Sequence, residues 1–84
     1  MDTQVGEFLI RSGFLCRVAL QEFKGRQRLD VRAFYEAPDG TWQPTTKGLN
    51  IAVDLLPEFT RLVTDAQRMA EEGGLIDPKD FNED

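Results

Sequence analysis

Histidine is absent from this 84-residue sequence, and cysteine occurs once. The absence of histidine excludes Ser-His-Asp and Cys-His catalytic sites and histidine-ligated zinc. The lone Cys16 cannot form an intramolecular disulfide, which favours a reducing compartment. The chain also lacks an apolar run of about 18 residues and the basic start of a signal peptide. We therefore expect a cytoplasmic protein without membrane association.

Catalytic and cofactor motifs are equally scarce. The sequence contains no metal-binding cluster, no pairing of a nucleophile with a base, and no phosphate-binding loop. Neighbouring acids such as Glu71 and Glu72 on a helix do not face each other, so a solvated surface explains them. We expect neither enzyme activity, nor a cofactor, nor a bound metal.

The short length limits the chain to one small domain whose core is marginal, so a dimer is a reasonable expectation. We divide it into an N-terminal segment with a possible first strand at 1–16, a binding domain at 17–74, and an acidic tail at 75–84. The tail is expected to be largely disordered, and it could recruit a protein partner.

Charge is unevenly distributed over these parts. The net charge of the whole sequence is -5. Residues 17–48 hold six basic and four acidic side chains, a net charge of +2, so the remainder carries -7. Because phosphate attracts basic surfaces, the overall acidity argues against a general nucleic-acid binder, but it does not exclude binding through the middle third.

The middle third has the pattern of a β-meander. Apolar and polar residues alternate with a period of two in 17–21 and again in 28–33, which predicts two half-buried strands. Gly25 suits a tight hairpin turn between them, and Pro38-Asp39-Gly40 predicts the next turn. A further strand is expected over 41–51, where Pro44 indicates an edge or an interruption. A weaker pattern predicts an earlier strand over 7–15, with a bend at Ser12-Gly13.

The period changes to that of a helix after Asp54, which is a possible N-terminal cap or an early acidic residue. Pro57 fits the first turn, and Gly73-Gly74 would end the helix. The apolar stripe is wide enough to suggest a second copy of the chain as its partner. The expected dimer contacts are Leu55, Leu56, Phe59, Leu62, Val63 and Ala66.

Aromatic residues are interleaved with cations along the meander. Flat rings for bases and cations for phosphates are what single-strand binding requires. The alternative is that the rings are core and the cations solvated, and Trp42 suits either role. Strict alternation places Arg32 on the face of Phe34 rather than of Tyr35, so a site that uses both Arg32 and Tyr35 needs a bulge or a strand end between them.

Several segments resemble the DNA-binding core of the transcriptional coactivator positive cofactor four. They are Phe23-Lys24-Gly25, the segment from Asp30 to Tyr35, and Lys47-Gly48 after a Pro-Asp-Gly turn. The resemblance covers about residues 17–70. It implies an α+β fold with a curved four-stranded antiparallel sheet and one C-terminal helix, pairing of two chains through the helices, and single-stranded DNA across the sheets. The missing regulatory arm indicates a compact bacterial or viral relative.

The resemblance also implies functional positions. Phe23 and Lys24 match hairpin residues that meet DNA, Arg32 matches a strand arginine, Tyr35 stands where an aromatic stacks on a base, and Lys47 belongs to the Lys-Gly pair. With the residues singled out by composition, the full set of expected DNA contacts is Phe23, Lys24, Gly25, Arg26, Arg32, Tyr35, Trp42, Lys47 and Gly48.

The sequence thus predicts a homodimer that binds single-stranded DNA with little sequence preference, as a transcription cofactor or an accessory factor of DNA metabolism. Two alternatives stay open. RNA could be the ligand, since stacking tolerates both sugars. Alternatively, the sheet could be a module that contacts a transcription or replication enzyme. In that case Arg32 and Lys47 would be dispensable, whereas Leu56 and Phe59 would not.

Overall fold

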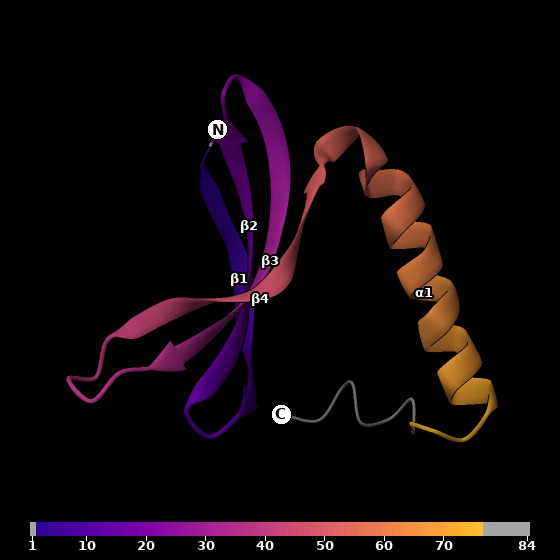
Figure 1. Ribbon diagram of the computed structural model, residues 1–84. Coiled ribbons are helices and arrows are strands. Elements are labelled where there is room, and N and C mark those ends of the chain that lie inside the picture. Colours follow the sequence, from indigo (N-terminus) through magenta and orange to yellow (C-terminus); the bar gives the residue numbers. More distant parts are fainter. Residues whose placement is uncertain (1, 77–84) are drawn as a thin grey trace. The chain divides into compact units, whose positions relative to one another are not determined.

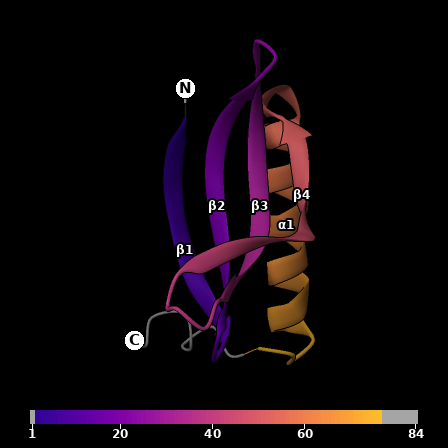
Figure 2. The same cartoon turned by 60° about the vertical axis from the view of Figure 1, so that its left-hand side comes forward.

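The computed structural model describes residues 2–76, which fall into a sheet unit ending at Asp54 and a helical unit beginning at Leu55. The sheet unit is a four-stranded antiparallel meander in the order β1-β2-β3-β4 (Figures 1 and 2). Its strands are β1 (Thr3–Arg11), β2 (Phe14–Phe23), β3 (Arg26–Glu36) and β4 (Trp42–Ala52). The expected α+β fold with four antiparallel strands and a following helix is confirmed.

The two faces of the sheet differ in chemistry. Paired residues of antiparallel neighbours share a face, and successive residues alternate between faces. The aliphatic face carries Val18 opposite Val31 and Leu20 opposite Leu29, with Leu49 and Ile51 from β4. The other, which we call the cationic face, carries these side chains in the same register: Arg17, Phe23, Arg26, Arg28, Arg32, Phe34 and Trp42.

Burial in the described residues is slight and concentrated in the middle of the sheet. Only Leu15, Leu29 and Asp30 are buried there. Leu15 lies on the cationic face and Leu29 on the aliphatic face, so each face keeps a single well-covered leucine. A single sheet layer cannot enclose a core on both sides, and this leaves many apolar side chains accessible.

Tight turns connect the strands where glycine was expected to allow them. Lys24 and Gly25 form a two-residue hairpin loop and both have positive φ, the pattern of a type I′ turn. At the β3–β4 turn, Asp39 accepts hydrogen bonds from the backbone N–H and the hydroxyl of Thr41. These interactions lower the pKa of Asp39.

The pairing of β3 with β4 is irregular at one place. Arg32 pairs with Gly48, and Phe34 pairs with Pro44. The stretch of β4 between these two pairs is longer than the matching stretch of β3, so β4 contains a bulge. Bulges bend a strand and increase its twist. Figure 1 shows the β3–β4 hairpin end pointing in a different direction from the β1–β2 turn. The irregularity expected near Pro44 on an edge strand is confirmed.

The helical unit consists of α1 (Leu56–Glu72), which follows the 3₁₀ turn η1 (Val53–Leu55). Pro57 lies in the first turn as expected. Of the two roles expected for Asp54, the structure excludes that of a helix cap: Leu55 occupies the N-cap position and no side chain accepts a capping hydrogen bond. Asp54 is instead an early acidic residue in the 3₁₀ turn. Gly73 and Gly74 terminate the helix, with backbone hydrogen bonds back to Met69 and Glu71.

The first strand begins earlier than the sequence pattern indicated. The pattern placed it over 7–15, whereas β1 starts at Thr3, Ser12-Gly13 is a turn, and Phe14 and Leu15 belong to β2. The expected boundary between the N-terminal segment and the binding domain, at residue 17, therefore lies inside β2. Two bulges in the β1–β2 pairing interrupt the alternation of β1, which explains its weak pattern. Most of the expected acidic tail, 77–84, lies outside the described residues.

Candidate nucleic-acid interface

The β2–β3 hairpin presents an aromatic ring and a cation together. Phe23 ends β2 on the cationic face, and this residue is 62% exposed. Lys24 follows in the turn with φ of 52°, and its Nζ lies 5.3 Å from the centroid of the Phe23 ring. A lysine in the left-handed region is strained relative to glycine or asparagine. An exposed ring beside a cation at a hairpin tip suits a ligand that combines flat and anionic groups.

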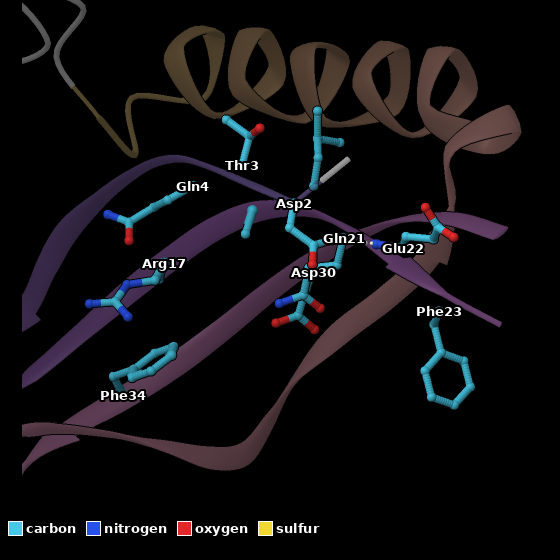
Figure 3. A pocket seen from close by; sticks show the side chains of 11 residues that line it. Asp2, Thr3, Gln4, Arg17, Gln21, Glu22, Phe23, Asp30 and Phe34 are labelled. Atoms are coloured by element: carbon cyan, nitrogen blue, oxygen red, sulfur yellow. Dashed lines mark hydrogen bonds between the residues drawn. The ribbon is translucent and has the colours of Figure 1, made fainter. Parts of the chain in front are cut away.

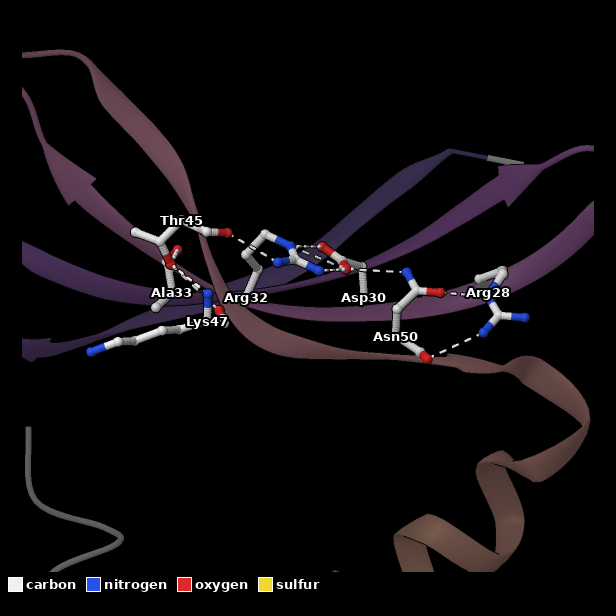
Figure 4. Close-up of polar contacts among 7 residues, drawn as sticks. All are labelled: Arg28, Asp30, Arg32, Ala33, Thr45, Lys47 and Asn50. Carbon is white, nitrogen blue, oxygen red and sulfur yellow. Dashed lines mark hydrogen bonds and ion pairs between the residues drawn. The ribbon is translucent and has the colours of Figure 1, made fainter.

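A polar network crosses β3 and β4 on the cationic face (Figure 4). Arg32 donates to both carboxylate oxygens of Asp30, with an Nη2–Oδ1 distance of 2.8 Å. Asn50 donates from Nδ2 to the same carboxylate at 3.1 Å, and Arg28 in turn donates to Asn50. Asp30 is only 7% exposed, and a buried charge is costly unless it is paired and hydrogen-bonded. These donors compensate the charge of its carboxylate.

The network also determines the ionisation of its central carboxylate. The hydrogen bond from Arg32 holds the pKa of Asp30 below its ordinary value of 3.8, against the opposing effect of burial; the Asn50 hydrogen bond and the charge of Arg32 lower it further. Asp30 correspondingly raises the pKa of Arg32. The two groups therefore stay charged at neutral pH. Asp30 orients Arg32 directly, whereas Arg28 is held by Asn50, and the Asp30–Arg32 pair is the centre of the network.

The same arginine fixes the bulge of β4. Arg32 donates from Nη1 to the carbonyl oxygen of Thr45 at 3.0 Å. The Thr45 hydroxyl donates to the carbonyl oxygen of Ala33 and accepts from the backbone N–H of Lys47. The side chain of Lys47 is exposed and points away from the Asp30–Arg32 pair in Figure 4. The bulge thus holds Lys47 as an accessible cation on a fixed backbone.

Gly48 is required by the close approach of β4 to β3. A Cβ placed on Gly48 would clash with the carbonyl oxygen of Val31 and would stand 3.0 Å from the Cα of Arg32. Both neighbours are backbone atoms and cannot move without displacing the strand. Gly48 therefore serves the geometry of the bulge, which is the role that turn and bulge chemistry predicts for it.

A hollow of about 390 Å³ lies over β1, β2 and β3 in the sheet unit (Figure 3). Arg17 and Phe34 lie at one end and Phe23 at the other. Ala19 and Gln21 of β2 and Asp30 of β3 also line it. This volume is within the lower part of the range of about 300–1,000 Å³ that is typical of small-molecule sites. The hollow is therefore large enough to hold a planar group between the two aromatic ends.

The cations differ in whether they are already neutralised. Within residues 2–76, no ion pair involves Lys24, Arg26 or Lys47. Arg32 is paired with Asp30, and Arg17 is paired with Glu7. Unpaired exposed cations are the more available to an external anion, because paired ones have to give up a partner.

The structure brings four of the nine expected contacts together on one face and places Lys24 and Gly25 in the adjoining turn, whereas Lys47 points away from the Asp30–Arg32 pair and Tyr35 lies apart. Phe23, Arg26, Arg32 and Trp42 share the cationic face, with Trp42 half-buried. The β2–β3 register runs without a break from Phe23 and Arg26 to Phe14 and Tyr35, so Tyr35 points to the opposite face. The bulge that could have brought Arg32 and Tyr35 together lies in β4, not in β3.

Sequence reasoning did not select three residues that the geometry now emphasises. They are Arg17, Phe34 and Glu7, which lie together on the cationic face. Strict alternation along the two strands could have placed Arg17 and Phe34 on this face. Glu7 could not be placed because bulges disturb the alternation of β1.

The described residues offer neither a metal centre nor a membrane-spanning helix. No three His, Cys, Asp or Glu side chains between residues 2 and 76 gather closely enough to hold a metal ion. None of the helices described there has the length and apolar character that crossing a membrane requires.

A protein-family model matches more than half of this sequence. Residues 13–62, from the start of β2 into α1, match the model of Transcriptional Coactivator p15 (PC4). The chain belongs to the PC4 family. PC4-family proteins are DNA-binding coactivators rather than enzymes. No curated protein sequence matches the chain.

Solved structures share the fold. One is BPSL1147, a PC4 homologue from Burkholderia pseudomallei, with a TM-score of 0.73 and 24% sequence identity over 80% of this chain and 90% of that one. Another is the PC4 homologue of bacteriophage T5, implicated in recombination-dependent DNA replication. It has a TM-score of 0.62 and 19% identity over 88% of this chain and 82% of that one. The PC4 fold therefore persists here at low sequence identity.

Proposed function

We propose that this chain is a non-enzymatic protein that binds single-stranded DNA with little sequence preference. The observation that carries the proposal is the cationic face, where the sheet register gathers Phe23, Phe34 and Trp42 with four arginines. Rings that stack on bases and cations that meet phosphates give affinity without reading base edges. Membership of a DNA-binding family supports the same conclusion.

The proposed contacts follow from the state of each side chain. Lys24, Arg26 and Lys47 meet backbone phosphates because they are exposed and have no ion pair among the described residues. Bases stack on Phe23 and on the accessible part of Trp42. Arg32 acts mainly by holding the bulge, and Gly25 and Gly48 allow the hairpin turn and the close strand approach. Tyr35 is left out of this surface because it points to the other face.

The dimer is proposed to form through α1. Its apolar stripe is accessible: at least half of each of the Leu55, Leu62 and Val63 side chains is exposed. The opposite side of the helix carries ion pairs of Arg61 and Arg68 with nearby acids. A helix with one apolar and one salt-bridged side favours pairing through the apolar one. The proposed contacts are Leu55, Leu56, Phe59, Leu62, Val63 and Ala66.

Fluorescence anisotropy of a labelled oligothymidine over a salt series tests the binding function. We expect binding at low salt that weakens as salt increases, and a further loss in Lys47→Ala. Arg68→Ala is the matched control, since it removes the same charge from the ion-paired side of α1. No binding at low salt, or an affinity that ignores salt, would contradict the proposal, as would equal losses in the two variants.

The biological setting belongs to the same proposal. We place the protein in the cytoplasm, with the nucleoid as its site in a bacterium, as an accessory factor of transcription or DNA metabolism. Competition between oligothymidine and an RNA of matched sequence would show whether RNA is preferred. If sheet variants kept cellular function while Leu56 or Phe59 variants lost it, a protein-contact role would replace DNA binding.

A further inference from the structure

Three side chains form a ladder across β1, β2 and β3 on the cationic face. Glu7 is paired with Arg17, and Phe34 stands diagonal to Arg17 because it is paired with Leu15. Arg17 donates from Nε to Oε1 of Glu7 at 2.9 Å. Its Cζ lies 4.2 Å from the centroid of the Phe34 ring. Diagonal neighbours on one face of a sheet are close enough for such contacts.

This ladder holds a planar cation in one orientation. The ring of Phe34 lies against the guanidinium group of Arg17. The hydrogen bond from Nε to Glu7 fixes one edge of that guanidinium group. The Arg17 side chain nevertheless remains 27% exposed. Guanidinium groups stack on aromatic and base planes, which an ammonium group does not do. The accessible part of Arg17 borders the hollow whose far end is formed by Phe23 (Figure 3).

The charge of Arg17 is less available to phosphate than that of the unpaired cations. Glu7 already neutralises it, whereas Lys24, Arg26 and Lys47 have no such partner among the described residues. A paired, ring-backed guanidinium beside a hollow is better suited to a flat and weakly charged group than to a bare anion.

We propose that the Arg17–Phe34 stack, held by Glu7, is a platform for one unstacked nucleobase of the bound strand. The base lies in the hollow between this stack and Phe23. The inference rests on the proposed binding of single-stranded DNA, and it assigns Arg17 to base stacking rather than to phosphate neutralisation.

The chain supplies a matched control on its other face. Arg11 lies over Phe14 with a Cζ-to-centroid distance of 4.3 Å, nearly the geometry of the Arg17–Phe34 pair. The register places Phe14 and its partner Arg11 on the aliphatic face. Arg11→Lys therefore repeats the chemical change of Arg17→Lys away from the proposed base site.

The experiment compares oligothymidine with an abasic oligonucleotide of equal length, which keeps the phosphates and removes the bases. Anisotropy is measured with the full chain, and thermal melting confirms that each variant folds. Because stacking is worth roughly 1–3 kcal/mol per base, we expect Arg17→Lys to weaken oligothymidine binding by about fivefold or more. Its affinity for the abasic strand should change by less than about twofold, since the charge is retained. Arg11→Lys should change the affinity for neither oligonucleotide.

Glu7→Gln provides a second, independent variant. It releases the Arg17 charge while nearly preserving the shape of the ladder. We expect oligothymidine to lose affinity relative to the abasic strand, together with a steeper salt dependence as Arg17 turns to phosphate.

The outcomes separate the two proposals. If wild-type protein binds neither oligonucleotide at low salt, the proposed function fails. If it binds oligothymidine but Arg17→Lys has no effect, or weakens both oligonucleotides equally, the base platform alone is overturned. Equal effects of Arg17→Lys and Arg11→Lys would also overturn it.

Discussion

Lys24 combines a strained backbone with an exposed charge. A non-glycine residue with φ of 52° costs energy in a type I′ turn, where asparagine is preferred. Lys24→Asn should therefore raise the free energy of unfolding by about 0.5–1 kcal/mol. The same change should weaken binding to oligothymidine and reduce the magnitude of the salt slope by about 1, because one phosphate contact is lost.

Chemical denaturation and anisotropy on the same samples measure both effects of Lys24→Asn. Gln27→Asn is a suitable control, since it changes a neighbouring polar residue of β3 without changing the charge. A Lys24→Asn protein that is more stable and binds as well as wild type would show that the lysine has no role in DNA binding.

Asp30 links stability to pH through its ion pair. Its pKa is lowered below 3.8 in the folded protein, chiefly by the hydrogen bond from Arg32. Asp30 therefore binds a proton more readily in the unfolded chain than in the folded protein. The ionised carboxylate stabilises the fold fully above pH 3.8, and this stabilisation is lost as pH falls through the lower pKa of the folded state. Asp30→Asn should cost about 1.5–3 kcal/mol at neutral pH, the value of hydrogen bonds to charged groups.

The difference in unfolding free energy between wild type and Asp30→Asn should shrink on acidification, since protonated Asp30 resembles asparagine. Urea titrations at neutral pH and at several acidic pH values provide the measurement. A difference that stays constant down to strongly acidic pH would mean that the Asp30 charge does not stabilise the fold.

At the scale of the element, α1 is a helix with two unlike sides. The side of Arg61 and Arg68 is held by ion pairs, while the apolar stripe is open to a partner. Ala66→Glu places a charge in the middle of the stripe without removing a packed side chain. We expect it to convert a dimer into a monomer, because the new charge would lose its water at the interface.

Sedimentation velocity at several concentrations distinguishes the two states. Thr64→Glu is the matched control: it adds the same charge near Arg61 and Arg68, away from the stripe, and should leave the dimer intact. A monomeric wild-type protein, or a dimer unaffected by Ala66→Glu, would rule out pairing through this side of α1.

At the scale of the whole molecule, charge is polarised rather than uniformly negative. The net charge is -5, yet the sheet region 17–48 is positive. With Lys24, Arg26 and Lys47 as the three phosphate contacts, the slope of log affinity against log salt for a single strand should be about -2 per protomer, using roughly 0.7 per contact. Duplex DNA should bind more weakly at every salt concentration, because stacked bases are not available to the rings.

Competition of labelled oligothymidine with unlabelled single and double strands tests this expectation. A slope far steeper than about -2, or duplex binding equal to single-strand binding, would show that charge rather than stacking dominates. The acidic remainder of the chain reduces long-range attraction, so association should be slower than for a basic relative.

The sequence by itself determined the meander, its turns at Gly25 and at 38–40, and the helix, because period-two and helical patterns and turn residues are local signals. It also placed Arg32 and Phe34 on one face, since alternation needs only the strand. The position of the β4 bulge and the bulges of β1 depend on pairing between strands. The family resemblance assigned Tyr35 to the binding surface, although the register turns it away. The Glu7–Arg17–Phe34 ladder was missed because it depends on pairing across three strands. Only the tertiary structure decided which cations are neutralised, because an ion pair such as Asp30–Arg32 requires both side chains in their folded positions.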